Sequence, residues 1–222
     1  MTSFRLKLLA MFSMIFDHIG FMFTQNNILL NLAFRTIGRL AFPIFAFQLS
    51  VGYSHSKNKE KHIVRMLIFA ILSQFPYWLY IQTALPGVGH ILNIGFTFLL
   101  ALLGMYTLDK VNGLIAKCFS LIIVLALSCI LPVDYGILGV LLCVSFYIFR
   151  NHKYLNLASA GIIVILKVLL EQDLIKYAMI YALLPIYLYN GKKGLDNKFA
   201  KYLFYVFYPA HLLLFAVIKI II

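Results

Sequence analysis

Charged residues are scarce in this chain of 222 residues: Asp, Glu, Lys and Arg together make up 12% of it, and only 7 residues are acidic. Soluble domains carry about 25% charged residues. A soluble chain of this length also has no core large enough to hide an apolar share of 63%. The composition therefore excludes an ordinary soluble protein and favours a chain dissolved in a bilayer.

Cysteine is scarce as well. Cys118, Cys129 and Cys143 lie in apolar stretches and form no CxxC pair. An odd number of cysteines without such a motif predicts neither a disulfide framework nor a metal site. We expect them to act as small apolar helix residues, and we expect no bound metal.

What the chain does contain is a series of long apolar runs. Lipid offers no hydrogen-bond partner to backbone N–H and C=O groups, so a spanning chain must be helical or a closed barrel. Uninterrupted apolar runs, rather than alternating ones, favour helices. The run after Lys7 contains Asp17 and His18 and has no small-residue cleavage site, so it predicts a retained span rather than a signal peptide. Pro43 is expected to kink the second span.

We predict an all-α, multi-pass membrane protein of the inner or plasma membrane, with residues 1–222 as a single transmembrane domain. It has about nine spans, with eight or ten as alternatives, at residues 5–24, 33–54, 63–83, 91–108, 113–131, 135–149, 154–171, 174–190 and 200–221.

Basic residues outnumber acidic ones and give a net charge of +12. A nucleic-acid-binding protein gathers such residues on one soluble face, but here most of them flank the apolar runs. This placement predicts topology signals and contacts with anionic lipid headgroups, without a nucleic-acid partner. A cytoplasmic N-terminus and nine spans are self-consistent, because the outer loops 84–90 and 132–134 then carry no Lys or Arg. The predicted inner residues are Arg5, Lys7, Lys57, Lys59, Lys61, Arg65, Lys110, Lys117, Arg150, Lys153, Lys192, Lys193, Lys198 and Lys201.

Ionisable residues inside the apolar runs are functional candidates, because a charge in lipid is costly. Asp17 and His18 lie in the first span, and a rise of about 1.5 Å per residue places His18 roughly 20 Å from its inner end. Arg35 and Arg39 share a helix face, and we expect an arginine to pair with Asp17. His211 lies near the midplane of the last span. These residues meet if their helices are neighbours.

Each candidate also has a purely structural alternative. An Asp–Arg pair locks helices together in many bundles, and a lone His often makes a helix–helix hydrogen bond. Asn93 and Thr97, one helical turn apart, are typical of such helix contacts. We expect Lys167 and Lys219 to extend to the outer interface, and His62 to lie in a solvated loop.

Blocks of residues spread over nearly the whole chain carry a resemblance to a known family. The blocks are Asp17-His18-Ile19-Gly20, Arg35-Thr36-Ile37-Gly38-Arg39-Leu40-Ala41-Phe42-Pro43-Ile44-Phe45-Ala46-Phe47, Ser73-Gln74-Phe75-Pro76, Asn93-Ile94-Gly95-Phe96-Thr97, Asp134-Tyr135-Gly136, Tyr189-Asn190-Gly191-Lys192 and Phe207-Tyr208-Pro209-Ala210-His211. They resemble the TraX family of bacterial membrane proteins. That family is named for a conjugation protein that acetylates the N-terminus of pilin, and it is similar to a wider superfamily of multi-span acyltransferases. Lys7 and His18 match a spacing between a basic residue and a His in the first span of that superfamily. Gln74 departs from the family, in which a Glu is expected.

The resemblance implies acyl transfer, with acetyl-CoA as the donor on the cytoplasmic side. Such chemistry needs a base, which His18 or His211 supplies. Asp17 would orient His18 or pair with Arg39, and Arg35 with Arg39 would hold the carbonyl oxygen or the acceptor. A peptide N-terminal amine is the favoured acceptor, with a glycan or a lipid as alternatives. The expected substrate-binding residues are Arg35, Lys7, Gln74, Asn93, Thr97, Asp134, Tyr208, Asn190 and Lys192.

Two other classes of function use the same features. Buried Asp, His and Arg residues also build proton relays, so a proton-coupled transporter is the main alternative. A non-catalytic assembly or anchoring subunit is the third. Label transferred from a donor to an acceptor distinguishes the enzyme from both, and solute flux that depends on a gradient distinguishes the transporter.

Overall fold

The regular structure is helical in the residues described by the computed structural model, which are 1–195 and 198–221 without the side chains of 198–201. Lys198 and Lys201, assigned above to the inner side, thus have side chains outside the described residues. One isolated bridge joins Leu92 to Val133. The helices are α1 (Ser3–Phe23), α2 (Ile28–Gly38), α3 (Ala41–Ser54), α4 (Lys59–Ala84), α5 (Ile94–Lys110), α6 (Leu114–Ile130), α7 (Gly136–Ile148), α8 (Lys153–Glu171), the 3₁₀ helix η1 (Leu174–Ala182), α9 (Leu183–Tyr187) and α10 (Lys198–Ile221).

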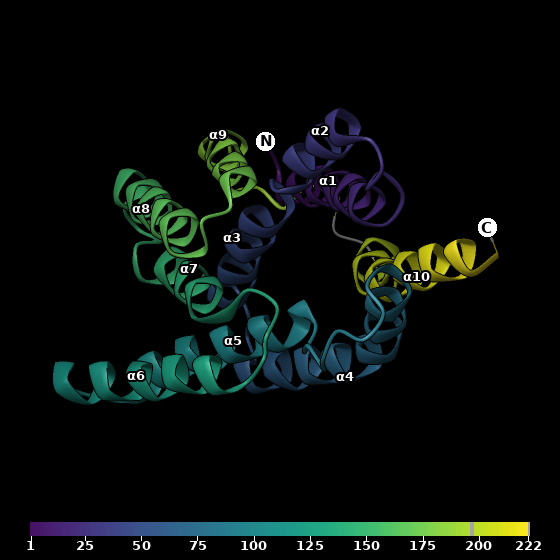
Figure 1. Cartoon of the computed structure of the whole chain (residues 1–222). Coiled ribbons are helices and arrows are strands. Elements are labelled where there is room, and N and C mark those ends of the chain that lie inside the picture. The colour runs from purple at the N-terminus through teal and green to yellow at the C-terminus, as the bar shows by residue number, and fades with distance from the viewer. Residues whose placement is uncertain (196–197, 222) are drawn as a thin grey trace.

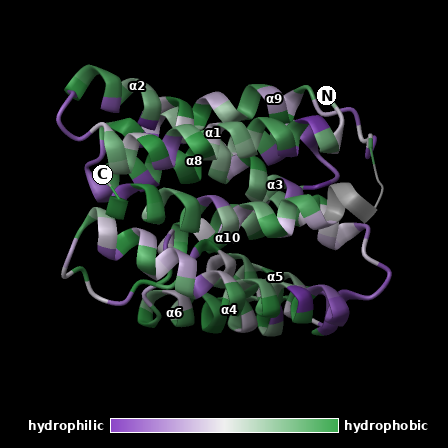
Figure 2. Cartoon of the chain, turned by 90° about the vertical axis from the view of Figure 1, so that its right-hand side faces the viewer, coloured by the Kyte–Doolittle hydropathy of each residue, from purple (hydrophilic) through white to green (hydrophobic). Residues whose placement is uncertain are grey.

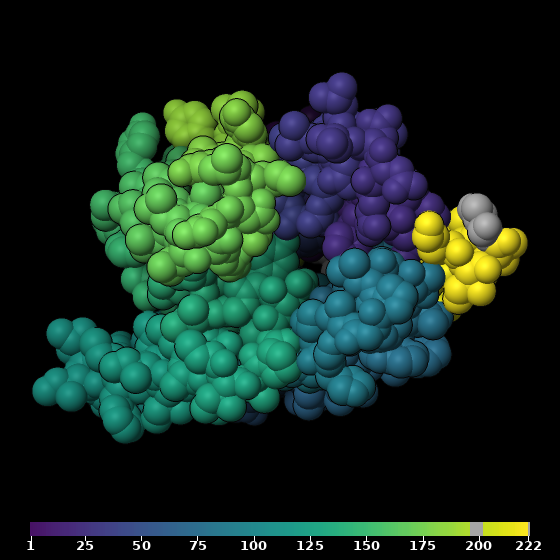
Figure 3. Space-filling view, in the orientation of Figure 1, coloured from purple at the N-terminus to yellow at the C-terminus, as the bar shows by residue number. Residues whose placement is uncertain are grey.

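The helices surround a central region. α1 packs on α2, α3 and α10, and α10 packs on α4, so the first and the last helix of the chain lie side by side (Figure 1). α6 and the C-terminal part of α10 project from opposite sides of the molecule (Figure 3). Apolar colour covers the length of the helices, polar colour gathers at the two ends of the bundle, and the termini lie at opposite ends (Figure 2).

The helix surfaces are those of a membrane protein. Five segments are long and apolar enough to cross a bilayer: Ser3–Phe23, Ile28–Ser54, Lys59–Ala84, Lys153–Glu171 and Tyr202–Ile221. Large apolar side chains stand bare on the outside, such as Ile28 at 82% exposure and Ile115 at 87%, as lipid-facing positions require. The predicted all-α membrane fold is confirmed, whereas the count of nine spans and the orientation stay predictions.

The predicted second span is a broken helix. α2 ends at Gly38, Arg39 caps it, and α3 begins at Ala41. Pro43 lies in the first turn of α3, where a missing N–H leaves no intrahelical bond unmade. The break therefore precedes the proline, and Arg39 lies in the turn between the two helices, where its backbone N–H donates to the carbonyl of Arg35 (3.0 Å).

A second irregular segment descends into the bundle between α4 and α5. Gln74 anchors it from the middle of α4: its Nε2 donates to the carbonyl of Ile91 (2.9 Å), and its Oε1 accepts from the backbone N–H of Asn93 (3.0 Å). Gly95 lets α5 start against α4, because a Cβ there would lie 2.8 Å from the Cα of Ala70. Such non-helical backbone at depth is tolerated where protein or a cavity surrounds it.

The predicted span at residues 174–190 is also irregular. It forms η1 over Leu174–Ala182 and the short α9 over Leu183–Tyr187. Runs of 3₁₀ helix longer than three or four residues are uncommon, and apolar composition alone does not distinguish them from an α-helical span.

The basic end of the bundle is held together by loops that are distant in sequence. The backbone of Ser3 donates to Lys192 (2.9 Å), and that of Asn190 donates to Met1 (2.9 Å). At the same end, Asp109 accepts from Tyr53 (3.0 Å), Tyr147 and Lys59. These contacts place residues assigned above to the inner side at one end of the molecule.

Candidate active site

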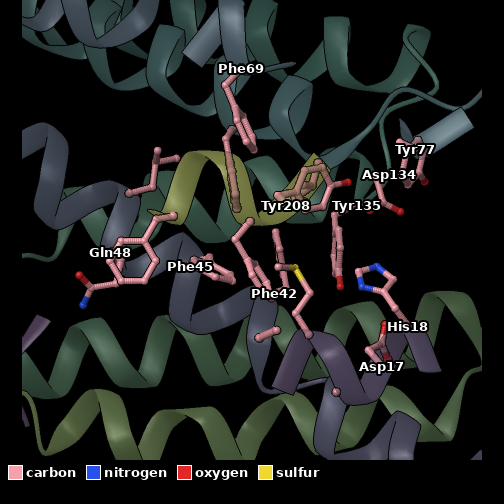
Figure 4. A pocket seen from close by; sticks show the side chains of 18 of the residues that line it. Asp17, His18, Phe42, Phe45, Gln48, Phe69, Tyr77, Asp134, Tyr135 and Tyr208 are labelled. Atoms are coloured by element: carbon pink, nitrogen blue, oxygen red, sulfur yellow. The ribbon is translucent and has the colours of Figure 1, made fainter. Parts of the chain in front are cut away.

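A cavity of about 940 Å³ runs through the middle of the bundle. Its wall includes side chains from α1, α2, α3, α4 and α10, together with the turn before α7. Figure 4 shows Asp17 and His18 on one wall, with Tyr208, Tyr135 and Asp134 facing them. Predicted site residues that line it are Lys7, Asp17, His18, Arg35, Arg39, Asp134 and Tyr208.

An ion-pair cluster forms the centre of the cavity wall. Nη2 of Arg39 donates to both carboxylate oxygens of Asp17, at 2.5 and 2.7 Å, and Nη1 of Arg35 donates at 3.0 Å. The predicted pairing of Asp17 with an arginine is confirmed, and both arginines take part. Gly38 makes it possible, because a Cβ there would lie 2.5 Å from the Cα of Asp17. Two cations share one carboxylate, so the cluster keeps a net positive charge that suits an anion.

The two candidate histidines touch across α1 and α10. Nε2 of His211 lies 2.9 Å from Nδ1 of His18, and Nδ1 of His211 lies 2.7 Å from the carbonyl oxygen of Phe207. A carbonyl only accepts, so Nδ1 of His211 carries a proton. With both rings neutral, Nε2 of His211 accepts from Nδ1 of His18, and Nε2 of His18 keeps its lone pair.

The histidines differ in their access to the cavity. His18 lines it, whereas His211 lies behind His18 with only 6% of its surface exposed. The hydroxyl of Tyr80 holds the backbone carbonyl of His18 (3.0 Å). The geometry thus offers His18 as the basic group at the cavity surface and His211 as the residue that fixes its tautomer.

Arg39 retains a donor beyond its ion pair. Its side chain is 8% exposed, and its Nε–H is buried without a hydrogen-bond partner among the described residues. A buried donor that lacks an acceptor costs about 1–3 kcal/mol. The same N–H would stabilise a negatively charged oxygen placed beside it.

At the basic end of the bundle, polar and basic side chains line the cavity. Lys7, His62 and Arg65 line it, together with Gln48. Oε1 of Gln48 accepts from Ser3 (2.5 Å), and its buried Nε2 has no partner among the described residues. The expectation that His62 lies in a solvated loop is wrong, because α4 begins at Lys59 and carries His62 in its first turn. Cations and a spare amide donor suit the phosphates of a donor such as acetyl-CoA.

The opposite end of the cavity carries acids and lysines from α8 and η1. Nζ of Lys167 donates to Glu171 (2.5 Å) and to the carbonyl of Tyr135 (3.3 Å). The expectation that Lys167 extends to the outer interface is wrong, because Glu171, one turn later, gives it a partner inside. Lys167 is only 5% exposed.

The remaining predicted site residues lie away from the cavity. Asn93 caps α5 and donates to Ala70 (2.8 Å) and Gln74 (2.7 Å), so the amides of Gln74 and Asn93 serve to anchor the segment before α5. Thr97 is fully buried. Asn190 accepts from the backbone N–H of Lys192 (3.1 Å) in the basic-end loop that meets the N-terminus.

Sequence reasoning missed several wall residues. Tyr77 and Tyr80, three residues apart, share the inward face of α4, and a same-face tyrosine pair is a signal that helical spacing provides. Arg65 and Glu171 had no such signal, because each lies near a helix end where a polar residue is expected. Gln48 lies in the middle of α3, where a polar side chain within an apolar run is a signal that was not used.

Comparison with known proteins matches nearly the whole chain, as the blocks quoted in the sequence do. The family model described as TraX protein matches residues 3–219. A probable fimbrial assembly protein FimC, serogroup H1, from Dichelobacter nodosus is 29% identical over 232 residues, which cover 96% of this chain and 93% of that protein. No solved structure matches the chain. The matched residues include every wall side chain described above.

Proposed function

Because the chain belongs to the TraX family, we propose that it is a membrane-embedded acyltransferase that serves the assembly of a pilus or fimbria. The observation that carries the proposal is the position of His18, which lines the same cavity as Arg39, a cation with a spare buried N–H, and which turns Nδ1 to His211. A base and an oxyanion-stabilising donor in one cavity are what acyl transfer from a thioester requires.

The wall residues suggest an order of events. Lys7, His62 and Arg65 would hold the phosphates of acetyl-CoA at the inner end, which leaves the acetyl thioester to extend toward Arg39. His18 takes a proton from the acceptor as the acceptor attacks the carbonyl carbon. Arg39 stabilises the resulting oxyanion, the C–S bond breaks, and the imidazolium returns its proton to the sulfur. His211 keeps His18 in the tautomer with a basic Nε2.

The proposal includes an orientation. The N-terminus and the loops that follow α3, α5, α7 and α9 share one end of the bundle, which carries most of the basic residues, and the positive-inside rule puts that end in the cytoplasm. Nine spans of the inner membrane then leave the C-terminus outside. A cavity with wall residues toward both ends would let an inner donor meet an acceptor from the outer side.

The test is transfer of label from isotopically labelled acetyl-CoA in membranes that contain the wild type or His18→Ala at matched expression. Loss of the base is expected to lower the rate by about 10²- to 10⁴-fold. His90→Ala is the control, because His90 lies exposed in the loop before α5. A wild type that binds the donor and transfers no label to peptide, glycan or lipid would contradict the proposal.

A proton-coupled transporter is the second candidate, and the observation that favours it is the run of ionisable side chains from one end of the cavity to the other. Solute flux in proteoliposomes that depends on a proton gradient and is lost in His18→Ala would favour transport over transfer.

A further inference from the structure

A second pocket lies at the basic end of the bundle, on the other side of α3 from the central cavity. Its volume is about 460 Å³, within the usual range for a small ligand. It lies among α3, α7, α8 and α9, which pack on one another (Figure 1). Two faces of α3 separate the spaces: Gln48 and Leu49 line the central cavity, whereas Ser50 and Val51 line the second pocket. No described residue lines both, so the second pocket is a site of its own.

The lining of this pocket carries cations and no acid. Arg150, in the turn after α7, and Lys153, the first residue of α8, both line it, and none of its described lining residues is Asp or Glu. Neither cation makes an ion pair within the part of the chain that the structure describes. Nη1 of Arg150 donates to the carbonyl of Tyr147 (2.8 Å), and Nζ of Lys153 lies 3.8 Å from the centroid of the Tyr187 ring. Two cations without carboxylate partners suit an anionic ligand.

A buried serine adds a spare hydrogen-bond donor to the wall of the pocket. Ser50 is only 2% exposed, it lines the pocket, and its hydroxyl makes no hydrogen bond to another described residue. Ser54, one turn later on the same face of α3, differs because its hydroxyl donates to the carbonyl of Ser50 (2.9 Å). α8 begins at Lys153 without a side-chain cap, and the N–H groups of a first helical turn lack partners within their helix. Donors of both kinds favour an anion with several oxygens.

The pocket changes from charged to apolar over one helical turn. Phe146 lies four residues before Arg150, and Leu157 lies four residues after Lys153, so both are about 5 to 6 Å farther from the basic end. Phe47, one turn before Val51, is placed in the same way on α3. A glycerophospholipid has this order of groups, with a phosphate at the membrane interface and chains below it. A soluble phosphate compound makes no use of the apolar part.

From this arrangement we infer that the second pocket binds the phosphate of an anionic glycerophospholipid from the leaflet at the basic end of the bundle. Arg150 and Lys153 pair with the phosphate, and the hydroxyl of Ser50 donates to a lipid oxygen. The first carbons of the chains contact Phe47 and Phe146. The site differs from a general attraction of anionic lipids to the basic end, which would involve every cation there alike. It uses no residue of the central cavity and does not depend on acyl transfer.

The first measurement is equilibrium binding of three probes to the purified wild type in detergent. Phosphatidylglycerol carries the phosphate and the chains, diacylglycerol with the same chains lacks the phosphate, and glycerol 3-phosphate lacks the chains. We expect phosphatidylglycerol to bind about 10- to 100-fold more tightly than diacylglycerol, the factor that charge-assisted hydrogen bonds provide. Equal binding of the two lipids would overturn the inference. Displacement of the lipid by an equal concentration of glycerol 3-phosphate would overturn the lipid as occupant and assign the pocket to a soluble phosphate.

The second measurement separates the pocket from the other cations of the basic end. Arg150→Gln and Lys153→Gln are each expected to weaken the binding of phosphatidylglycerol by about 10-fold. Lys110→Gln is the matched control, because Lys110 is an exposed cation outside the pocket whose Nζ also lies over a ring, 5.5 Å from the centroid of Tyr106. An equal loss in Lys110→Gln would reduce the binding to general attraction and overturn the site.

The third measurement tests whether the lipid enters the pocket. Ser50→Ala removes the spare hydroxyl and is expected to weaken the binding of phosphatidylglycerol by about 2- to 10-fold. Ser54→Ala is its control and should bind normally, since that hydroxyl is already donated within α3. Unchanged affinity in Ser50→Ala would leave the lipid at the exposed cations and overturn the site. If a variant fails to fold, the comparison of the three probes on the wild type decides.

Discussion

Two aspartates in this bundle, Asp17 and Asp109, each form a network of ion pairs and hydrogen bonds, and the two networks differ in whether all their donors have partners. Asp17 is held by Arg35 and Arg39 in the middle of the molecule, and Asp109 is held by Lys59, Tyr53 and Tyr147 at its basic end. The side chain of Asp17 is 15% exposed and that of Asp109 is 26% exposed. Asp17 lines the cavity, and Asp109 does not.

The difference lies in what each network leaves over. The Asp109 network joins one cation to one carboxylate and gives both phenols an acceptor, so it is complete within the protein. The Asp17 network has a surplus cation and a buried Nε–H on Arg39 that has no partner among the described residues. Complete networks fix a structure, whereas a surplus donor at a cavity wall has a use only when a ligand supplies the acceptor.

The sharpest way to break this comparison is a reciprocal exchange of cations, Arg39→Lys in one network and Lys59→Arg in the other. Arg39→Lys keeps a charge beside Asp17 but removes the Nε–H and the planar fork. We expect it to lower the rate of label transfer by on the order of 10²- to 10³-fold, the cost of one oxyanion donor. Lys59→Arg should leave the rate unchanged.

The exchange is measured per amount of folded protein, with donor binding determined separately. A normal rate in Arg39→Lys would show that the spare N–H serves no transition state. An equal loss in both variants would show that transfer follows the integrity of the bundle, and the distinction between the two networks would disappear.

The sequence predicted the Asp17 network better than the Asp109 network, for a physical reason. A charged residue within an apolar run is costly in lipid, so the sequence alone identifies Asp17, Arg35 and Arg39 as candidate functional residues. His211 was found in the same way, and the close contact of His18 with His211 needed only that α1 and α10 be neighbours. Asp109 lies at a helix end, where a charge is ordinary, so nothing marked its phenol partners.

Backbone irregularity was the feature that the sequence did not predict. The anchoring of the segment before α5 depends on which atoms Gln74 and Asn93 reach, and both residues were expected to bind substrate. The 3₁₀ geometry of η1 could not be predicted from the sequence either, because an apolar composition is typical of both a 3₁₀ helix and an α-helix in a bundle. Lys167 shows the same limit. Its position in the sequence predicted a side chain at the outer interface, but in the structure it is buried and donates to Glu171.

A smaller effect is expected from Asp109→Ala, and it should appear in stability rather than rate. The substitution leaves the hydroxyls of Tyr53 and Tyr147 without their acceptor, and these two residues are 0% and 4% exposed. Unsatisfied buried hydroxyls cost about 1–3 kcal/mol. Thermal unfolding in detergent should shift to lower temperature while label transfer by the folded fraction stays normal. Glu60→Ala, which removes an exposed partner of Tyr106, is the control, and a loss of transfer in Asp109→Ala would contradict the structural role.

The smallest expected effect is the pH dependence of that stability. Asp109 lies beyond the predicted span 91–108. Burial alone would raise its pKa, but hydrogen bonds from Lys59, Tyr147 and Tyr53 bring the pKa below the ordinary value. A carboxyl whose pKa is lower in the folded state contributes stability that is complete above its unfolded pKa of about 3.9 and is lost as the pH falls through the folded value. The difference in unfolding temperature between the wild type and Asp109→Asn should therefore be constant from pH 5 to 8 and shrink only below about pH 4. A difference that changes between pH 6 and 8 would assign the effect to a histidine instead, and Asp109 would then no longer serve as the purely structural counterpart of Asp17.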